Sequence, residues 1–236
     1  RLMLFVLKKK ESAWLYAHGN TELTETQAQE FIRLIEERAS GKPLAYILGE
    51  WEFYGRPFYV NEHVLIPRPE TEELIRQALP HIDVWRGAHP GKQMTIADIG
   101  TGSGVIIITL AIELSKFHIP DSKFHFIATD ISPKALKVAN KNAQRHGVQD
   151  QIEFIREDIT ETLQRNIDLI VSNPPYLPAE ALAKAGWAID TQGLTFEPRM
   201  ALDGGLDGQE FVQKIVKSNI PAIVETTGGN IQTFNI

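Results

Sequence analysis

The stretch Thr95-Ile-Ala-Asp-Ile-Gly-Thr-Gly-Ser-Gly-Val-Ile-Ile-Ile-Thr-Leu-Ala-Ile-Glu-Leu114 decides the fold. Its first residues, 95–99, predict a short buried strand; three glycines follow at alternate positions, and 105–114 predicts a helix. Glycine lets the backbone turn tightly and come close to a ligand, where a Cβ would clash. The stretch therefore predicts a strand, a ligand-binding turn and a helix that begins directly behind the turn.

The region after this stretch alternates between apolar runs and amphipathic segments. Further strands are predicted at residues 124–128, 152–155 and 167–171, and a helix is predicted at 133–145. Such a rhythm is typical of a parallel, doubly wound sheet with right-handed crossovers. We therefore predict the α/β class with a Rossmann-like sheet, in which ligands bind at the carboxyl ends of the strands.

The N-terminal third has a different pattern of apolar and turn residues. Apolar spacing and turn residues predict, in order, a helix at 2–7, a helix at 24–38, a β-hairpin at 46–60, a helix at 71–78 and a linker at 80–92. Thr24 and Gln27 form a capping box before the second helix. We therefore divide the chain into a small helical N-terminal domain with a β-hairpin, 1–79, and a larger α/β domain, 80–236.

The composition narrows the classes of function. The 236 residues carry a formal net charge of −6, which disfavours a protein that must hold a long stretch of nucleic acid. Cysteine is absent and the seven histidines are scattered, so we expect no metal site. The longest apolar run, 105–112, is far shorter than the ~20 residues of a membrane span, and no secretory signal is visible. We therefore expect a cytoplasmic protein without a membrane partner.

The glycine turn indicates the kind of ligand. Its spacing is Gly-x-Gly-x-Gly and not the Gly-x-Gly-x-x-Gly of dinucleotide-binding turns. A pyrophosphate needs a longer cradle of backbone N–H groups, whereas S-adenosyl-L-methionine carries no phosphate. We therefore favour S-adenosyl-L-methionine, with cofactor-binding residues Asp98, Gly100, Thr101, Gly102, Ser103 and Gly104. Asp98 is expected to face the amino-acid portion of the cofactor or to orient the turn.

Acidic residues follow the next two predicted strands. Asp130 ends the second strand, where a carboxylate can accept both ribose hydroxyl groups. Glu157-Asp158 follows the third strand, and we expect Asp158 to accept an adenine amino proton while Ile159 packs on the ring. Each acid alone is equally well explained as a helix N-cap or a surface charge. Their order at successive strand ends favours a cofactor site.

The tetrapeptide Asn173-Pro174-Pro175-Tyr176 follows the fourth predicted strand directly. Its two prolines stiffen the loop and remove two N–H donors, so the loop presents oxygen acceptors. The side-chain carbonyl of Asn173 and the backbone carbonyl of Pro174 can hold both hydrogens of an NH₂ group and steer its lone pair toward a methyl donor. We therefore predict catalytic roles for these four residues, with Tyr176 walling a flat substrate group, and Asn173 also borders the cofactor.

The tetrapeptide by itself leaves the methyl acceptor open. A side-chain amide, the N6 amine of adenine and the N2 amine of guanine are all planar nitrogens that such a loop can hold. A proline-stiffened turn with no catalytic role is the simplest alternative. Its position after a glycine turn and two acidic strand ends favours the catalytic interpretation.

Together these residues resemble the HemK/PrmC family, the release-factor glutamine N5-methyltransferases. The turn at 98–104 resembles the family's S-adenosylmethionine loop, Asp130 its ribose carboxylate, Asp158 its adenine-side acid and 173–176 its acceptor motif. The resemblance covers nearly the whole chain. It implies methyl transfer to the glutamine amide in the Gly-Gly-Gln loop of peptide release factors, with the N-terminal domain helping to dock that protein.

Two further stretches are more discriminating, because nucleic-acid methyltransferases share the Asn-Pro-Pro-Tyr motif. Leu65-Ile-Pro-Arg-Pro-Glu-Thr-Glu72 resembles the family's inter-domain segment, and 196–208 resembles its segment after the acceptor loop. We expect Arg68 and Glu70 to form a salt bridge at the domain interface rather than to act in catalysis. The resemblance implies a release factor as partner, no direct nucleic-acid requirement, and a cytoplasmic or organellar-matrix location.

The C-terminal end departs from the family pattern. Family members continue, after a Gly-Gly pair, with an apolar strand and two more strands, whereas Gly228-Gly229 is followed here by residues 230–236. The tail 231–236 alternates as a strand does but is more polar than a central strand. We therefore expect a sheet without its sixth and seventh strands. This leaves three hypotheses: a protein-glutamine methyltransferase, a nucleic-acid amino methyltransferase and a catalytically silent cofactor-binding module.

Overall fold

The structure is a computed structural model that describes residues 1–9, 11–116, 123–184 and 193–236. Its centre is a six-stranded sheet of strand order β5-β4-β3-β6-β7-β8. The strands are β3 (Met94–Ile99), β4 (Phe124–Thr129), β5 (Ile152–Ile155), β6 (Leu169–Ser172), β7 (Ala222–Thr226) and β8 (Asn230–Phe234). The first five are parallel and β8 is antiparallel to β7. The predicted α/β class with a doubly wound parallel sheet is confirmed.

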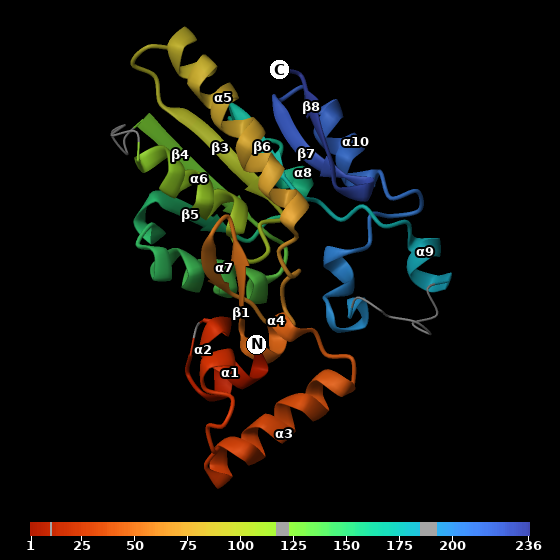
Figure 1. The fold of residues 1–236 in the computed structure, drawn as a ribbon. Coiled ribbons are helices and arrows are strands. Elements are labelled where there is room, and N and C mark those ends of the chain that lie inside the picture. The colour runs from red at the N-terminus through yellow and green to blue at the C-terminus, as the bar shows by residue number, and fades with distance from the viewer. Residues whose placement is uncertain (10, 117–122, 185–192) are drawn as a thin grey trace.

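Helices cover both faces of this sheet, as Figure 1 shows. One face carries α5 (Glu72–Ala88), α6 (Val105–Ser115) and α7 (Pro133–His146), and the other carries α8 (Ile159–Thr162) and α10 (Glu210–Lys217). Helix α6 is apolar all round because it lies buried between the sheet and its neighbours, and eight of its eleven residues are buried. Short pieces complete this part: α9 (Ala179–Lys184) and the 3₁₀ helices η3 (Gln149–Gln151), η4 (Leu194–Phe196), η5 (Arg199–Ala201) and η6 (Thr227–Gly229).

The N-terminal segments form a smaller body below the sheet in the view of Figure 1. They are α1 (Leu2–Val6), α2 (Ser12–Ala17), α3 (Glu25–Ala39), α4 (Leu44–Leu48), the hairpin strands β1 (Glu50–Phe53) and β2 (Arg56–Tyr59), and η1 (Pro69–Thr71). The predicted capping box is confirmed, since Thr24 accepts a hydrogen bond from the Gln27 backbone and Gln27 returns one. The hairpin is also confirmed, although it begins after α4, and its two turn residues both have positive φ.

The predicted linker at 80–92 is wrong over most of its length. Helix α5 does not end at Ala78 but continues through Pro80 to Ala88. A proline inside a helix costs about 3 kcal/mol, because it removes one hydrogen bond and clashes with the preceding turn. Leu74, Ile75 and Ile82 are fully buried against the sheet, and this packing holds the helix together across the proline.

The expectation for the C-terminal strands is also corrected. The apolar strand β7 lies before Gly228-Gly229 and was missed, and the polar tail forms β8, the sixth strand of the sheet. Strand β8 is an edge strand with three of its five residues exposed, so its polar pattern suits its place. No seventh strand of this sheet occurs in the described ranges. Within those same ranges, no helix is long and apolar enough to cross a membrane.

Candidate active site

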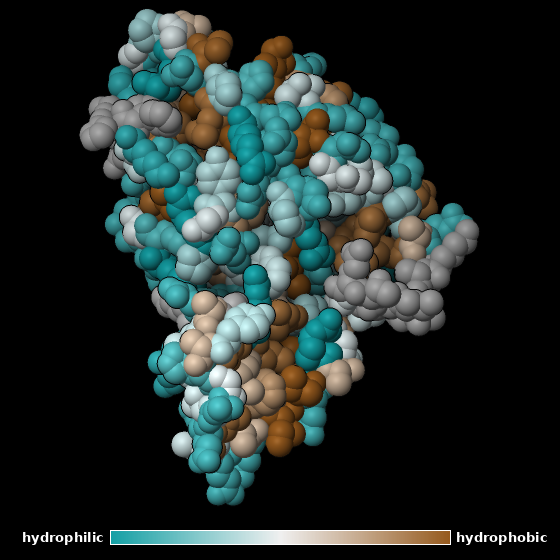
Figure 2. Space-filling view, viewed as in Figure 1, coloured by the Kyte–Doolittle hydropathy of each residue, from teal (hydrophilic) through white to brown (hydrophobic). Residues whose placement is uncertain are grey.

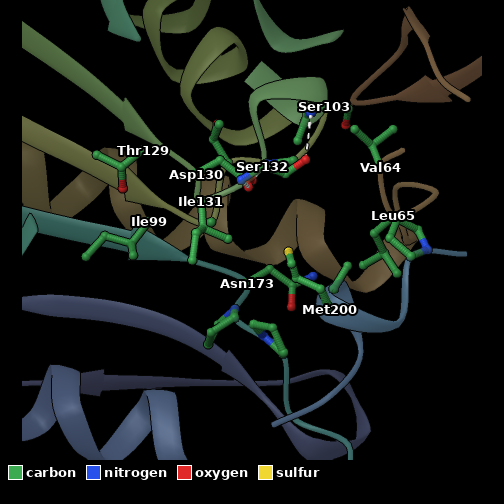
Figure 3. Close-up of a pocket in the computed structure, with 18 of the residues that line it drawn as sticks. Val64, Leu65, Ile99, Ser103, Thr129, Asp130, Ile131, Ser132, Asn173 and Met200 are labelled. Atoms are coloured by element: carbon green, nitrogen blue, oxygen red, sulfur yellow. Dashed lines mark hydrogen bonds between the residues drawn. The ribbon is translucent and has the colours of Figure 1, made fainter. Parts of the chain in front are cut away.

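A cavity of about 330 Å³ lies at the carboxyl ends of β3, β4, β5 and β6. Strand β3 lies between β4 and β6, so the chain order reverses here, which is where ligands bind in open α/β sheets. The predicted site residues that line the cavity are Gly100, Thr101, Gly102, Ser103, Asp130, Asp158, Ile159, Asn173, Pro174 and Pro175. Figure 3 shows Asp130 and Asn173 approaching this space from different strand ends, with Met200 beside Asn173.

The glycine turn takes its shape from backbone angles that favour glycine. Gly100 and Gly102 have φ of 72° and 55°, in the left-handed region that other residues rarely adopt. Gly104 does not line the cavity; it begins α6, and a Cβ there would lie 2.8 Å from Ile108 Cδ1 and 3.1 Å from Ala139 Cβ. The first two glycines therefore shape the cavity wall, whereas Gly104 lets α6 and α7 approach each other.

Asp98 is completely buried and does not line the cavity. Its Oδ2 atom accepts a hydrogen bond of 2.7 Å from the Thr101 hydroxyl, three residues on in the turn. Burial raises the pKa of Asp98 to about 7, and the Thr101 hydrogen bond opposes the rise. Of the two roles expected for Asp98, this geometry favours orientation of the turn over contact with a ligand.

Asp130 is held at the cavity wall by two backbone donors. The Gly102 N–H donates to Oδ2 at 2.9 Å and the Ser132 N–H donates to Oδ1 at 2.8 Å. Burial raises the pKa of Asp130, while these two N–H groups lower it. Each carboxylate oxygen keeps a second acceptor site, so the group can still accept a pair of ligand hydroxyls.

Asp158 is a helix N-cap, which was the alternative explanation for this acid, and it also lines the cavity. It is the N-cap of α8, where it accepts a hydrogen bond of 2.9 Å from the Glu161 N–H within a capping box. Its neighbour Glu157 is paired with Arg165, which lowers the pKa of Glu157. Asp158 and the buried Ile159 thus remain beside the cavity, and contact with adenine stays a prediction.

Asn173 presents one oxygen without a partner. Its Nδ2 atom donates a hydrogen bond of 3.0 Å to Thr71 Oγ1, whereas Oδ1 is buried and has no hydrogen-bond partner among the described residues. A buried acceptor without a partner is costly, and a role in binding or catalysis is one reason for a protein to keep it. Of the buried side-chain atoms without a partner among the described residues (Asp98 Oδ1, Thr109 Oγ1, Gln149 Oε1 and Asn173 Oδ1), only Asn173 Oδ1 belongs to a residue that lines the cavity. Asn173 is therefore placed to accept an N–H from a bound molecule.

Tyr176 is not brought to the cavity, unlike the other three residues of the tetrapeptide. Its hydroxyl donates a hydrogen bond of 3.3 Å to Glu225 Oε1, and burial raises the pKa of Tyr176 to about 12. The hydroxyl of Tyr176 points to Glu225 and not to the cavity, and its role as a wall for a flat substrate group stays a prediction.

The segment at 202–208 supports the acceptor loop from behind. Backbone hydrogen bonds join the Leu177 N–H to the Leu202 carbonyl at 2.9 Å and the Gly204 N–H to the Leu177 carbonyl at 2.8 Å. A Cβ at Gly204 would lie 2.7 Å from Tyr176 Cα, and one at Gly208 would lie 2.4 Å from the Tyr176 carbonyl oxygen. Only glycine permits this close approach, which explains the glycines of this stretch.

Arg68 forms an ion pair with Glu197, whose side chain is fully buried. The Arg68–Glu197 distance is 2.5 Å, and the other Glu197 oxygen accepts a hydrogen bond of 3.0 Å from the Ile66 N–H. The two discriminating stretches of the sequence, 65–72 and 196–208, therefore contact each other beside the cavity. Arg68 does form a salt bridge, but its partner is Glu197 and not Glu70, so the expected pairing of Arg68 with Glu70 is wrong.

Three buried polar residues of the site region were missed in the sequence: Thr71, Asn142 and Glu225. Glu225, on β7, accepts hydrogen bonds from Thr71 at 2.6 Å and from Tyr176. Asn142, on α7, joins the hairpin to the glycine turn, because its side chain bonds the Tyr59 backbone and the Ser103 carbonyl at 2.8 Å. A lone acid within the apolar run Ala-Ile-Val-Glu-Thr of β7 was the signal available for Glu225.

Comparisons with known proteins match both parts of the chain. Residues 1–49 match the PrmC N-terminal domain family, and residues 90–201 match a methyltransferase domain family. The release factor glutamine methyltransferase of Bacillus cereus is 37% identical over 95% of this chain and 74% of its own length. The release factor glutamine methyltransferase of Chlorobaculum tepidum is 38% identical over 85% of this chain and 66% of its own length. Among solved structures, the hMettl16 catalytic domain in complex with a MAT2A 3′UTR hairpin covers 94% of this chain and 81% of that chain at 14% identity, with a TM-score of 0.49.

Proposed function

We propose that this chain, which belongs to the release factor glutamine methyltransferase family, methylates the side-chain amide nitrogen (N5) of a glutamine in a peptide release factor. S-adenosyl-L-methionine is its cofactor. One observation carries the proposal: the buried Asn173 Oδ1 atom has no protein partner among the described residues and borders the cavity. A primary amide offers the N–H that this oxygen lacks.

The lining of the cavity fits S-adenosyl-L-methionine. We assign the glycine turn to its amino-acid portion, the Asp130 carboxylate to the ribose hydroxyls, and Asp158 with Ile159 to the adenine. The support is that Asp130 is already oriented by two backbone N–H groups and keeps acceptor capacity toward the cavity. When bound, this cofactor supplies an electrophilic methyl group on a sulfonium sulfur.

The acceptor loop then acts on the glutamine amide. Asn173 Oδ1 and the Pro174 backbone carbonyl accept its two N–H hydrogens, which raises electron density on a nitrogen whose lone pair is otherwise delocalised. Because the prolines stiffen the loop, the two acceptors stay in place and the lone pair is directed along one line. The nitrogen would take the methyl carbon as the methyl–sulfur bond breaks with its electron pair left on sulfur, and one N–H proton would then pass to water. Asn173 Oδ1 and the Pro174 carbonyl orient the amide by accepting its hydrogen bonds and take no proton themselves.

We assign the N-terminal domain, residues 1–79, to docking of the release factor. Exposed apolar side chains support this, because Phe5 is 46%, Ile32 56% and Ile35 46% exposed on its helices. Figure 2 shows apolar surface in this lower part of the molecule. Such side chains on a small domain beside a cavity are suited to a protein partner. We propose that the reaction takes place where translation terminates, in the cytoplasm or an organellar matrix. It requires neither a nucleic acid nor a membrane.

The test of the reaction uses methyl-labelled S-adenosyl-L-methionine with three acceptors. These are a peptide release factor, the same factor with Gln→Ala in its Gly-Gly-Gln loop, and a mixture of DNA and rRNA. Label is expected on the first acceptor alone. Label on the Ala version or only on nucleic acid would reject the proposal, and cofactor binding without transfer to any acceptor would favour a silent binding module.

The test of the site is Asn173→Ala. Loss of one of two acceptors is expected to lower kcat by roughly 100-fold. Cofactor affinity, measured by calorimetry, should remain nearly unchanged, because Asn173 Oδ1 is assigned to the substrate amide. An equal loss of cofactor affinity and turnover would mean that Asn173 serves the cofactor instead.

A further inference from the structure

We propose that Thr71 and Glu225 are positioning residues, which fix the direction of the Asn173 carboxamide so that Oδ1 and not Nδ2 faces the nitrogen to be methylated. The inference rests on the proposed function and adds two residues to it. The three side chains come from η1, from β7 and from the loop after β6, so only the folded chain brings them together.

The chain of hydrogen bonds is continuous and buried. Asn173 Nδ2 donates to Thr71 Oγ1 at 3.0 Å, and the Thr71 hydroxyl donates to Glu225 Oε2 at 2.6 Å. Thr71 is 2% and Glu225 1% exposed, so water does not compete for these groups. The Thr71 hydroxyl therefore has a donor, Asn173 Nδ2, on one side and an acceptor, Glu225 Oε2, on the other.

The direction of the bonds follows from counting protons. Burial raises the pKa of Glu225, and the hydrogen bonds from Thr71 and Tyr176 oppose the rise. When Glu225 is ionised, its carboxylate only accepts hydrogen bonds, and a hydroxyl has one proton, so the Thr71 proton is committed to Glu225. Thr71 Oγ1 can then only accept a hydrogen bond from Asn173. The donor of the Asn173 carboxamide is Nδ2, so Nδ2 must face Thr71. The opposite amide orientation would set Oδ1 against a lone pair of Thr71 and place the NH₂ of Asn173 against the NH₂ of the substrate.

Tyr176 completes the arrangement from the other side of the carboxylate. Its hydroxyl donates to Glu225 Oε1, the oxygen that Thr71 does not use. Glu225 thereby holds both ends of the acceptor tetrapeptide, Asn173 through Thr71 and Tyr176 directly. This accounts for an acid buried in the apolar strand β7 and for a tyrosine that turns away from the cavity.

The first variants are Thr71→Val and Thr71→Ser. Valine keeps the shape of threonine but removes the hydroxyl, so kcat for release-factor methylation is expected to fall by roughly 10- to 100-fold. The Km for the release factor and the affinity for S-adenosyl-L-methionine should stay close to those of the unchanged protein. Serine restores the hydroxyl, and kcat should return with it.

Glu225→Gln tests the proton count. A glutamine amide can donate to Thr71, which releases the Thr71 proton to bond Asn173 Oδ1 and favours the wrong amide orientation. A fall in kcat similar to that of Thr71→Val is expected. The matched control is Thr109→Val, because Thr109 is also fully buried but its hydroxyl has no hydrogen-bond partner within the described residues. The control should keep kcat.

A readout independent of turnover is the side-chain ¹H–¹⁵N resonances of Asn173. They should be protected from hydrogen exchange in the unchanged protein and in Thr71→Ser, and exposed to exchange in Thr71→Val. Unchanged kcat and unchanged Asn173 protection in Thr71→Val would overturn the inference, as would failure of serine to restore them. If the unchanged protein methylates no release factor, the proposed function fails, and the Asn173 resonances still decide the positioning role.

Discussion

Asp98, near the end of β3, has no salt-bridge partner in the part of the chain that the structure describes, and its burial has a consequence for stability. Its pKa is raised from the ordinary 3.8 to about 7. The folded protein therefore holds a proton on Asp98 between these values that the unfolded chain releases. Because Asp98 binds its proton more tightly in the folded state, its contribution to the free energy of unfolding falls as pH rises from about 3.8 to about 7.

Asp98→Asn should remove this pH dependence. The asparagine is neutral at every pH and can still accept the hydrogen bond from Thr101. Relative to Asp98→Asn, the unchanged protein is expected to lose thermal stability between pH 4 and pH 7. Melting temperatures of both proteins across that range measure the difference. Two parallel curves would contradict the raised pKa.

Asp130 is the residue assigned most directly to cofactor affinity. Asp130→Ala removes the ribose acceptor and leaves the Gly102 and Ser132 N–H groups without their partner. S-adenosyl-L-methionine affinity, measured by calorimetry, should fall by roughly 10-fold or more, since hydrogen bonds to a charged group contribute about 1.5–3 kcal/mol. Asp150→Ala, at an exposed position outside the cavity, is the control and should bind normally.

Two secondary-structure elements differ from the sequence prediction for the same physical reason. Helix α5 was expected to stop before Pro80 and β8 was expected to be missing, because proline opposes helices and polar residues oppose central strands. Tertiary packing outweighs both local preferences. Helix α5 continues past the proline because it buries an apolar face on the sheet, and β8 tolerates polar residues because it lies at the edge of the sheet. Elements with clear periodicity, such as α3 and α7, were predicted within a few residues.

The segment at 202–208 acts as a support for the acceptor loop, and this is testable at Gly208. Gly208→Ala places a Cβ 2.4 Å from the Tyr176 carbonyl oxygen at a φ of 73°, so the loop must move or strain. Strain of this kind costs about 1–3 kcal/mol. Both melting temperature and kcat should fall, while cofactor affinity stays near normal because the glycine turn is untouched.

Gly87→Ala is the matched control for this element. Gly87 lies inside α5, its φ is not positive, and an added Cβ would meet nothing within 4 Å. Alanine there should leave kcat unchanged and stabilise the helix by roughly 0.5–1 kcal/mol. If Gly208→Ala behaved like Gly87→Ala, the supporting role of the segment would be wrong.

At the scale of the whole molecule, residues 63–71, which follow the β-hairpin of the N-terminal body, form one side of the cavity. We therefore expect a protein substrate to contact both the cavity and the N-terminal body. The combined variant Ile32→Ser/Ile35→Ser tests docking on α3, where both side chains are exposed. It should raise the Km for the release factor without changing kcat or cofactor affinity. Val84→Ser, also exposed but on α5, should leave the Km unchanged. An unchanged Km in the double variant would remove α3 from the docking surface.

The amino-acid sequence by itself determined the features that depend on neighbours along the chain. These are the strand–turn–helix of the glycine loop, the stiff acceptor tetrapeptide, the capping box and the order of motifs at successive strand ends. Only the tertiary structure decided which side chains meet across long separations. Thr71 and Glu225 are 154 positions apart, yet they are joined by one hydrogen bond and together hold Asn173. Backbone preferences act locally, whereas burial and the pairing of buried polar groups are settled only when distant segments pack together.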